Sequence, residues 1–487
     1  MTPVTRAGGL ALLLVLAAAA ALSRILPFPR AVLLALWTFW VAGDERATGP
    51  LVWREPLVAG FVAGLLIGHL EAGLAIGVVW QAIWPGLLPL GGSRQPAVGL
   101  ATLVGIVWWI SMPQAWSAIR LPCALAAALV AGGWSLVAEG WLRARNRARV
   151  EGAEGPGRWE ALLRAGVLEA GGAGLLGLGL CAAFPLTLLS PGDVPDLAPL
   201  GSEAMVHLVL VALGGVVGER VWRRLRRGRR KAHRAPRSAR EEAPAPPAPP
   251  LRPARWEGLL ALQAAFSTGH LQRVGFLHLV RGAPGNRTRV ADLERQLMEE
   301  GTLNTQPVMA AALIGALDRI LVEREMPRSP LRLLELGGTM LAQWGDRAIW
   351  GGVRPGLALL ALAFFPLWHL GVAIAFPAVG LVLHFVARVR LYRWGWRRGW
   401  DLVQGGTGWC WDRLPGIAGG MLVPLALVAA VSLSAFAGPV PSAFPSRGLW
   451  FMLGVPLGAA AGSRPLPWGC VCCGVAALDA LAGAGVG

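Results

Sequence analysis

The sequence has few charged residues, a single tyrosine among 487 residues, and none of the motifs of soluble enzymes. Charged residues make up 15% of the chain and hydrophobic residues 55%, with a mean hydropathy of +0.53. Neither a phosphate-binding glycine loop nor a nucleophile paired with a base is found. This composition excludes an ordinary soluble domain and favours a membrane protein with several spans.

Metal-ligating residues are also scarce and scattered. The six cysteines lie in apolar segments without paired spacing, and the group Cys470, Cys472 and Cys473 has no histidine beside it. We interpret these as small apolar residues of a terminal helix. His270 and His278 are eight residues apart and the other histidines are isolated, so we expect no metal and no cofactor.

One segment carries most of the positive charge. Residues 219–256 contain 13 Lys/Arg against 3 Glu, which gives +10 of the formal +17 of the chain. Such a run cannot lie in hydrocarbon, and the positive-inside rule predicts a cytoplasmic location. Its Ala/Pro-rich end, 243–253, favours extended backbone. We therefore expect residues 223–255 to be a cytoplasmic linker, and because its charges adjoin apolar segments we expect no nucleic-acid partner.

Apolar stretches on both sides of the linker predict an all-α polytopic membrane fold. Before it they cover 8–22, 31–43, 56–69, 72–90, 97–119, 121–143, 163–190 and 203–222, and after it 303–322, 331–344, 352–389, 414–437, 448–462 and 467–486. A span requires roughly 20 residues. The short pair 56–69 and 72–90 therefore predicts a broken or re-entrant hairpin, which is tolerated only beside protein or a wet cavity.

The remaining polar segments are expected to be loops or membrane boundaries. We expect 143–158 and 281–301 to be loops, and the arginines of 388–398 to mark a cytoplasmic helix end. Residues 1–22 resemble a signal peptide as much as a helix. Between these alternatives we favour an uncleaved additional helix within residues 1–30.

Several short motifs after the linker occur in a recognisable order. They are Leu262-Gln263 through Gln272 with Gly275-Phe276, Asn304-Thr305-Gln306-Pro307, Gly345-Asp346 with Trp350 and Arg354-Pro355, and Gly395-Trp396-Arg397-Arg398-Gly399. With these motifs, the second half resembles the IID subunit of mannose-family sugar phosphotransferase permeases from Trp256 to about Gly438.

The first half resembles the IIC subunit of the same permeases over about 31–222. The residues that carry this resemblance are Asp44-Glu45, Pro56-Leu57-Val58 and glycines at 60, 64, 68, 73, 77, 86, 91 and 92. Small residues at such spacings allow two helices to approach closely. The family usually has glutamate at position 81 and histidine at position 306, where this chain has glutamine.

The two resemblances imply a fusion of IIC and IID: residues 1–30 precede a IIC-like domain at 31–222, the linker occupies 223–255, and a IID-like domain covers 256–487. The family implies a permease for a hexose-like sugar, soluble IIA and IIB partners that phosphorylate it, a homotrimer, and a bacterial inner membrane. No phosphoryl-carrying residue is visible on this chain, so whether it counts as an enzyme stays open.

Sugar hydroxyls are recognised by short polar side chains, because an unmatched polar group in a dry pocket is unfavourable. We expect substrate contacts from Gln81, Gln263, Gln272, Asn304, Thr305 and Gln306, and no catalytic residue. For Gln81 an inter-helix hydrogen bond is the alternative. For residues 304–307 the alternative is a helix start, and we expect Asp346 to cap the helix that follows it.

Two other functions remain open. One is a membrane scaffold or regulatory protein that retains the fold but does not transport. The other is an unrelated secondary transporter, which would require ion-coupling carboxylates in the membrane, and Glu71 and Asp346 are the main candidates.

Overall fold

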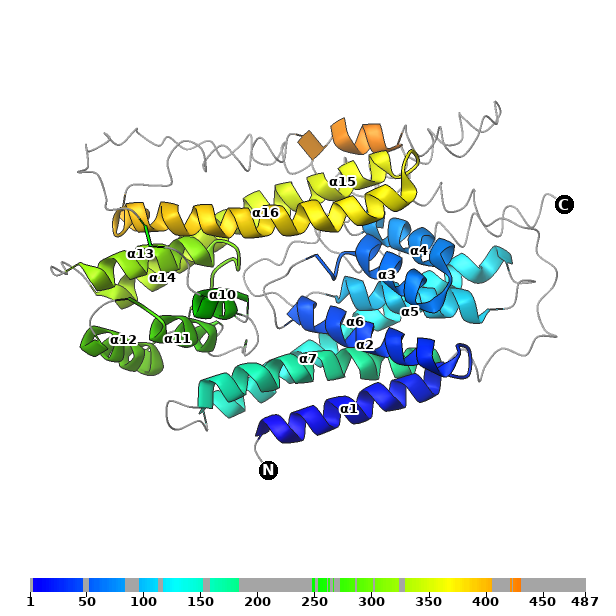
Figure 1. The fold of residues 1–487 in the computed structure, drawn as a ribbon, viewed down its shortest axis with the longest axis horizontal. Helices are drawn as coiled ribbons and strands as arrows, with labels where there is room; N and C mark the ends of the chain where they lie inside the picture. Colours follow the sequence, from blue (N-terminus) through cyan, green and yellow to red (C-terminus); the bar gives the residue numbers. More distant parts are fainter. Residues whose placement is uncertain are drawn as a thin grey trace.

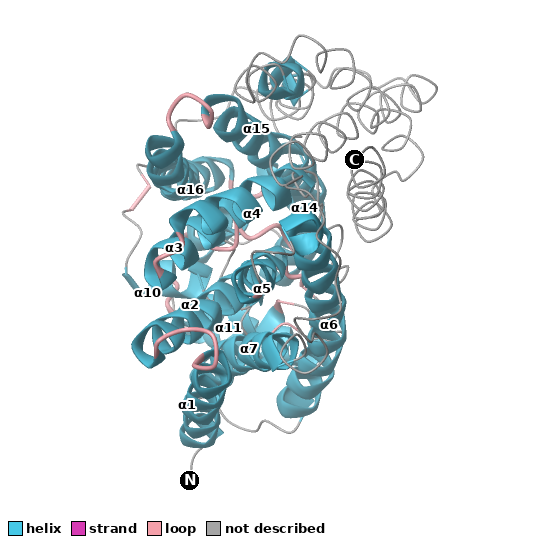
Figure 2. Cartoon of the chain, turned by 90° about the vertical axis from the view of Figure 1, so that its right-hand side faces the viewer, coloured by secondary structure: helices cyan, strands magenta, loops and turns pink. Residues whose placement is uncertain are grey.

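The computed structural model describes residues 3–46, 52–83, 96–112, 117–151, 158–183, 248–249, 253–260, 262, 266, 272–284, 287–300, 303–323, 329–404, 421–422 and 424–430. Within these ranges the chain folds into helices and contains no β-strand (Figure 2). The predicted all-α membrane fold is therefore confirmed. Most of the linker, the stretch 203–222 and the predicted spans at 448–462 and 467–486 lie outside the described residues.

The first half contains seven described helices (Figure 1). They are α1 (Pro3–Leu22), α2 (Phe28–Arg46), α3 (Pro56–Ile67), α4 (Leu70–Ile83), α5 (Val98–Ser111), α6 (Ser117–Glu151) and α7 (Arg158–Ala183). α1 packs along α2 and α7, and α5 packs along α6. α3 and α4 form the short hairpin that the sequence predicts.

The second half is described from Pro253 onwards. Its helices are α10 (Pro253–Leu260), α11 (Arg273–Arg281), α12 (Arg287–Glu300), α13 (Ala310–Val322), α14 (Pro330–Gly345), the π-helix η2 (Asp346–Val353), α15 (Arg354–Phe364), α16 (His369–Arg398) and α17 (Asp401–Gln404). The apolar run 352–389 is divided by a turn at residues 365–368, which include Pro366. As a result α15 and α16 form an antiparallel pair (Figure 1).

Two segments predicted as loops contain helix among the described residues. α6 continues through the arginine-rich segment to Glu151. It does so because arginine and alanine are good helix formers and because Arg149 and Arg145 bind Glu169 on α7, with N–O distances of 2.7 and 3.1 Å.

The segment 281–301, also predicted as a loop, contains α12. Leu293 and Leu297, four residues apart, are buried on one face of this polar helix. Arg281 and Glu294 form an ion pair of 2.9 Å that joins α11 to α12. The segment was predicted as a loop because most of its residues are polar and the apolar face of the helix is narrow.

Three helices among the described residues are long and apolar enough to cross a membrane: Arg120–Val150, Ala161–Leu180 and His369–Arg398. Shorter apolar helices occupy Gly9–Leu22, Pro56–Ile67, Leu70–Ile83 and Val98–Ser111. Many large apolar side chains on α1, α2, α7 and α16 are exposed. Such surfaces fit a lipid environment, and the chain is an integral membrane protein.

The two halves pack against each other. α16 contacts α3, α15 contacts α4, and α11 contacts α7. One buried apolar cluster combines helices of the first half with Leu359 and Leu362 of α15, and a second combines Val150 and Leu163 with α11 to α14. The hydrophobic cores therefore cross the division that the linker marks in the sequence.

Candidate functional site

The α3–α4 hairpin places polar groups deep in the protein because its backbones approach closely. A Cβ on Gly60 would lie 2.4 Å from the carbonyl oxygen of Gly73, so only glycine fits there. The turn between the helices uses Gly68 at φ 78°, a left-handed conformation that glycine adopts without strain. Arg30 of α2 donates a 2.9 Å hydrogen bond to the carbonyl of Ile67, which fixes the hairpin end.

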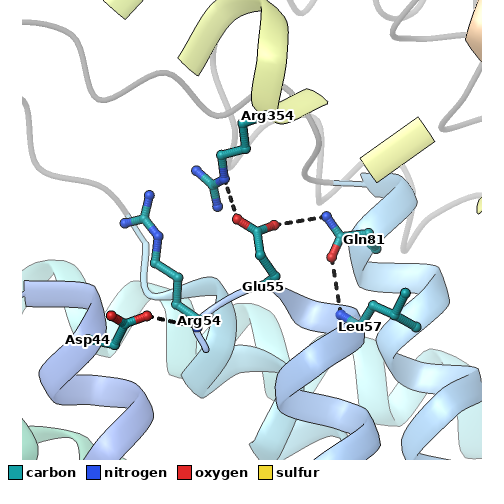
Figure 3. Close-up of polar contacts among 6 residues, drawn as sticks. All are labelled: Asp44, Arg54, Glu55, Leu57, Gln81 and Arg354. Atoms are coloured by element: carbon teal, nitrogen blue, oxygen red, sulfur yellow. Dashed lines mark hydrogen bonds and ion pairs between the residues drawn. The ribbon is translucent and has the colours of Figure 1, made fainter. Parts of the chain in front are cut away.

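Gln81 near the end of α4 binds the start of α3 (Figure 3). Its Oε1 accepts the backbone N–H of Leu57 at 3.1 Å, and its Nε2 donates to Oε2 of Glu55 at 3.0 Å. Gln81 is 1% exposed and Glu55 4% exposed. Both ends of the amide are thus engaged, so the predicted inter-helix hydrogen bonding of Gln81 is present.

Glu55 is the point at which the two halves meet. Arg354, the first residue of α15, donates from Nε to Glu55 Oε1, the oxygen that Gln81 does not contact (Figure 3). The guanidinium carbons of Arg54 and Arg354 lie 4.7 and 4.9 Å from the ring centroid of Trp350. Cation–π contacts of this kind are strengthened by desolvation.

We name this group the junction cluster; it consists of Arg54, Glu55, Gln81, Trp350 and Arg354. One further acid, Asp44, lies beside it. Asp44 of α2 accepts the backbone N–H of Arg54 at 3.2 Å through Oδ2 (Figure 3). Asp44 is 3% exposed. The segment before α3 is therefore bound at Arg54 by Asp44 of α2 and at Glu55 by Arg354 of the second half.

A neutral group, the amide cluster, consists of Gln272, Thr305 and Gln306. Gln272 Nε2 donates to the carbonyl of Thr305, and Thr305 N–H donates to Gln272 Oε1, both at 2.8 Å. Gln306 Oε1 accepts the N–H groups of Val308 and Met309 at 2.7 and 2.9 Å. Gln306 thus satisfies donors just before α13, so the helix-start interpretation of residues 304–307 has a physical basis.

The amide cluster retains hydrogen-bonding capacity. Gln306 Nε2 and Thr305 Oγ1 are buried and have no hydrogen-bond partner among the described residues. Thr305 is 3% exposed and Gln306 2% exposed. Buried polar atoms are nearly always paired, so such atoms are candidates for ligand contact.

The π-helix η2 connects the two clusters. The side chain of Gln306 lies against Gly345, where an added Cβ would be 2.4 Å from the Cβ of Gln306. η2 begins at the next residue and carries Trp350 of the junction cluster. The backbone at Gly345 and Asp346 is right-handed helical, so α14 runs directly into η2 and the predicted cap at Asp346 is wrong. π-helical turns are frequent at functional sites.

The predicted site residues fall into separate groups. Gln81 belongs to the junction cluster, while Gln272, Thr305 and Gln306 belong to the amide cluster; Asn304 is adjacent and partly exposed. Gln263 lies outside the described residues. Glu55 was missed as a site residue because it lies just outside the apolar segment 56–69, and only ionisable residues inside such segments indicate a functional site by default. The described residues contain no group of three metal-ligating side chains.

These features define an all-α membrane protein with a charged polar cluster buried between its halves and a neutral polar cluster buried within the second half. Residues 28–152 match the family model for the sorbose-specific IIC component of the phosphotransferase system. The matched range includes Asp44, Glu55 and Gln81 and supports a permease component of the mannose family of these systems. Comparisons with curated proteins and with solved structures gave no match.

Proposed function

We infer that this chain is the membrane permease of a mannose-type sugar phosphotransferase system, with IIC function before the linker and IID function after it. The observation that carries the proposal is the junction cluster. Glu55, within the IIC match, binds Arg354 of the second half across 299 positions of sequence. Two subunits joined in one chain would require such a contact between their membrane parts, and the linker would raise their effective concentration.

The substrate class that fits is a hexose-like sugar. Buried neutral donors and acceptors, such as Gln306 Nε2 and Thr305 Oγ1, suit the hydroxyls of an uncharged ligand. Gln81, Gln272, Asn304 and, by sequence, Gln263 complete the proposed contacts. Phosphorylation would occur on soluble IIA and IIB partners, and a homotrimer in a bacterial inner membrane with residues 223–255 in the cytoplasm belongs to this proposal.

A second candidate is a scaffold or regulatory protein that retains the fold without transport. The observation that favours it is that Glu55 and Gln81 are already hydrogen-bonded within the protein. Both oxygens of Glu55 and both ends of the Gln81 amide are bonded within the protein. A closed network of this kind leaves fewer groups for a substrate than an open pocket would.

Sugar uptake separates the two functions. The full chain would be placed in vesicles with soluble IIA, IIB and a phosphate donor system, and accumulation of sugar phosphate would be measured across hexoses and amino sugars. The permease predicts accumulation above vesicles without the chain that depends on IIB. Accumulation equal to the empty vesicles for every sugar, with the chain correctly inserted, would support the scaffold.

A further inference from the structure

α16 contains a buried arginine that has no counter-ion among the described residues. Arg388 is 0% exposed, and its Nε, Nη1 and Nη2 atoms have no hydrogen-bond partner among the described residues. Burying a guanidinium without an anion is strongly unfavourable, and the usual compensation is a paired acid or a bound anion. Arg388 therefore marks a place where an anion is needed.

The acid on the adjoining helix is already bonded. Asp318 of α13 forms an ion pair with Arg255 of α10, and its Oδ2 accepts the hydroxyl of Tyr392 at 3.0 Å. Tyr392 lies one helical turn beyond Arg388 on α16. Asp318 is therefore near Arg388, but its carboxylate already binds Arg255 and Tyr392. Gly315 and Gly395 bring the two helices into backbone contact there.

A second unpartnered group lies one turn before Arg388. His384 Nε2 is buried and has no hydrogen-bond partner among the described residues. Residues four apart share a helix face, so the imidazole and the guanidinium are neighbours. Together they offer donors from two side chains to a single oxyanion.

The position of Arg388 along α16 fits the headgroup layer. At about 1.5 Å per residue, the 19 steps from His369 to Arg388 cover about 28 Å, close to the roughly 30 Å of hydrocarbon in a bilayer. Trp256 packs on Phe385 with ring centroids 5.4 Å apart, and aromatic residues concentrate at this depth. Phe385 and Val386, three and two residues before Arg388, are exposed.

The charge beyond Arg388 would attract an anionic headgroup. Arg390, Arg393 and Arg397 follow on the same helix and are exposed. Basic residues at a membrane surface draw anionic lipids. A guanidinium also matches the geometry of phosphate oxygens better than an ammonium does, because it donates two parallel hydrogen bonds.

We propose that Arg388 and His384 bind a phosphate group at the headgroup end of α16. The shared chemistry is a phosphate oxyanion, which a phospholipid or free phosphate can supply, and the depth of the site favours the lipid. This site shares no residue with the proposed sugar contacts. It gives the second half a binding function that neither the junction cluster nor the amide cluster provides.

Thermal unfolding of the full chain in an uncharged, phosphate-free detergent tests this. The additions are phosphatidylglycerol, diacylglycerol with the same acyl chains, and inorganic phosphate. We expect phosphatidylglycerol to raise the Tm and diacylglycerol to leave it unchanged. A rise with inorganic phosphate alone at similar concentration would identify free phosphate as the source and would still support the site.

Variants on α16 assign the effect to Arg388. In Arg388→Met the rise in Tm should disappear, and without additions this variant should be at least as stable as the wild type because it buries no uncompensated charge. Arg390→Met, an exposed matched control, should retain the full rise. Arg388→Lys keeps the charge but not the paired donors, so it should need about tenfold more lipid. The proposal is overturned if the wild type responds to neither phosphate source, or if Arg388→Met responds as the wild type does.

Discussion

The junction cluster and the amide cluster are both buried and polar, but they are built on different principles. The junction cluster is charged and joins segments 299 residues apart, whereas the amide cluster is neutral and organises the segment before α13. Glu55 has partners on both oxygens, while Thr305 Oγ1 and Gln306 Nε2 have none among the described residues. The junction cluster therefore joins the two halves, whereas the amide cluster has buried polar atoms that could bind a ligand.

The largest expected effect is the loss of the inter-half ion pair. Arg354→Met leaves the buried Glu55 carboxylate without the cation that it contacts, and removing one partner of a buried pair costs about 3–5 kcal/mol. The measurement is denaturant unfolding of the purified chain in detergent. Arg347→Met is the matched control, because Arg347 lies on the neighbouring π-helix and is exposed.

A double variant separates the pair from simple packing. Glu55→Gln combined with Arg354→Met removes both charges, so the combined loss of stability should be smaller than the sum of the two single losses. Additive losses would contradict a direct contact between the halves at Glu55.

A smaller loss is expected from Gln81→Glu, which introduces the residue usual in the family. The change replaces the Nε2 donor, 3.0 Å from Glu55, with an oxygen and places two carboxylates together. Hydrogen bonds to charged groups contribute about 1.5–3 kcal/mol, so we expect a loss of about 2 kcal/mol in the same unfolding assay. A gain in stability would show that Glu55 does not carry its charge beside Gln81.

In the amide cluster, Gln272→Leu removes two hydrogen bonds to the backbone of Thr305. The two backbone groups remain buried, and we expect a loss of about 1–2 kcal/mol. Gln343→Leu on α14 is the control, since Gln343 is exposed. Equal unfolding midpoints for the two variants would mean that the Gln272 bonds do not hold this segment.

The smallest effect on stability is expected from Thr305→Val. The hydroxyl has no partner among the described residues, so its replacement by a methyl group of similar shape should change stability by less than about 1 kcal/mol. The rise in Tm on adding sugar should nevertheless require at least a tenfold higher sugar concentration than in the wild type. An unchanged response to sugar would remove Thr305 from the proposed contacts.

The sequence predicted the features that depend on local pattern. The glycine spacing and short apolar segments predicted the α3–α4 hairpin, and the close approach of Gly60 and Gly73 is the physical reason that this worked. The prediction of a loop at 281–301 was wrong because two buried leucines, Leu293 and Leu297, are enough to pack a polar helix against the protein. The Asp346 cap was wrong because the helix continues through that residue as a π-helix.

Contacts between residues far apart in the sequence could not be predicted. Asp44 and Arg354 were noted as parts of family motifs, but nothing local indicates that Arg354 binds Glu55 or that Trp350 contacts Arg54. Such partners are set by how the two halves pack, which charge counts and spacing do not encode. Gln81, Gln272, Thr305 and Gln306 were found as buried polar residues, while their division into two clusters required the three-dimensional arrangement.

The most direct test of the central claim is IIB-dependent accumulation of sugar phosphate by the wild-type chain, measured beside Thr305→Val and Gln343→Leu in the same vesicles. We expect accumulation by the wild type and by Gln343→Leu, and a strong reduction in Thr305→Val at equal amounts of inserted protein. Accumulation by the wild type no greater than that of empty vesicles, for all hexoses and amino sugars, would contradict this expectation.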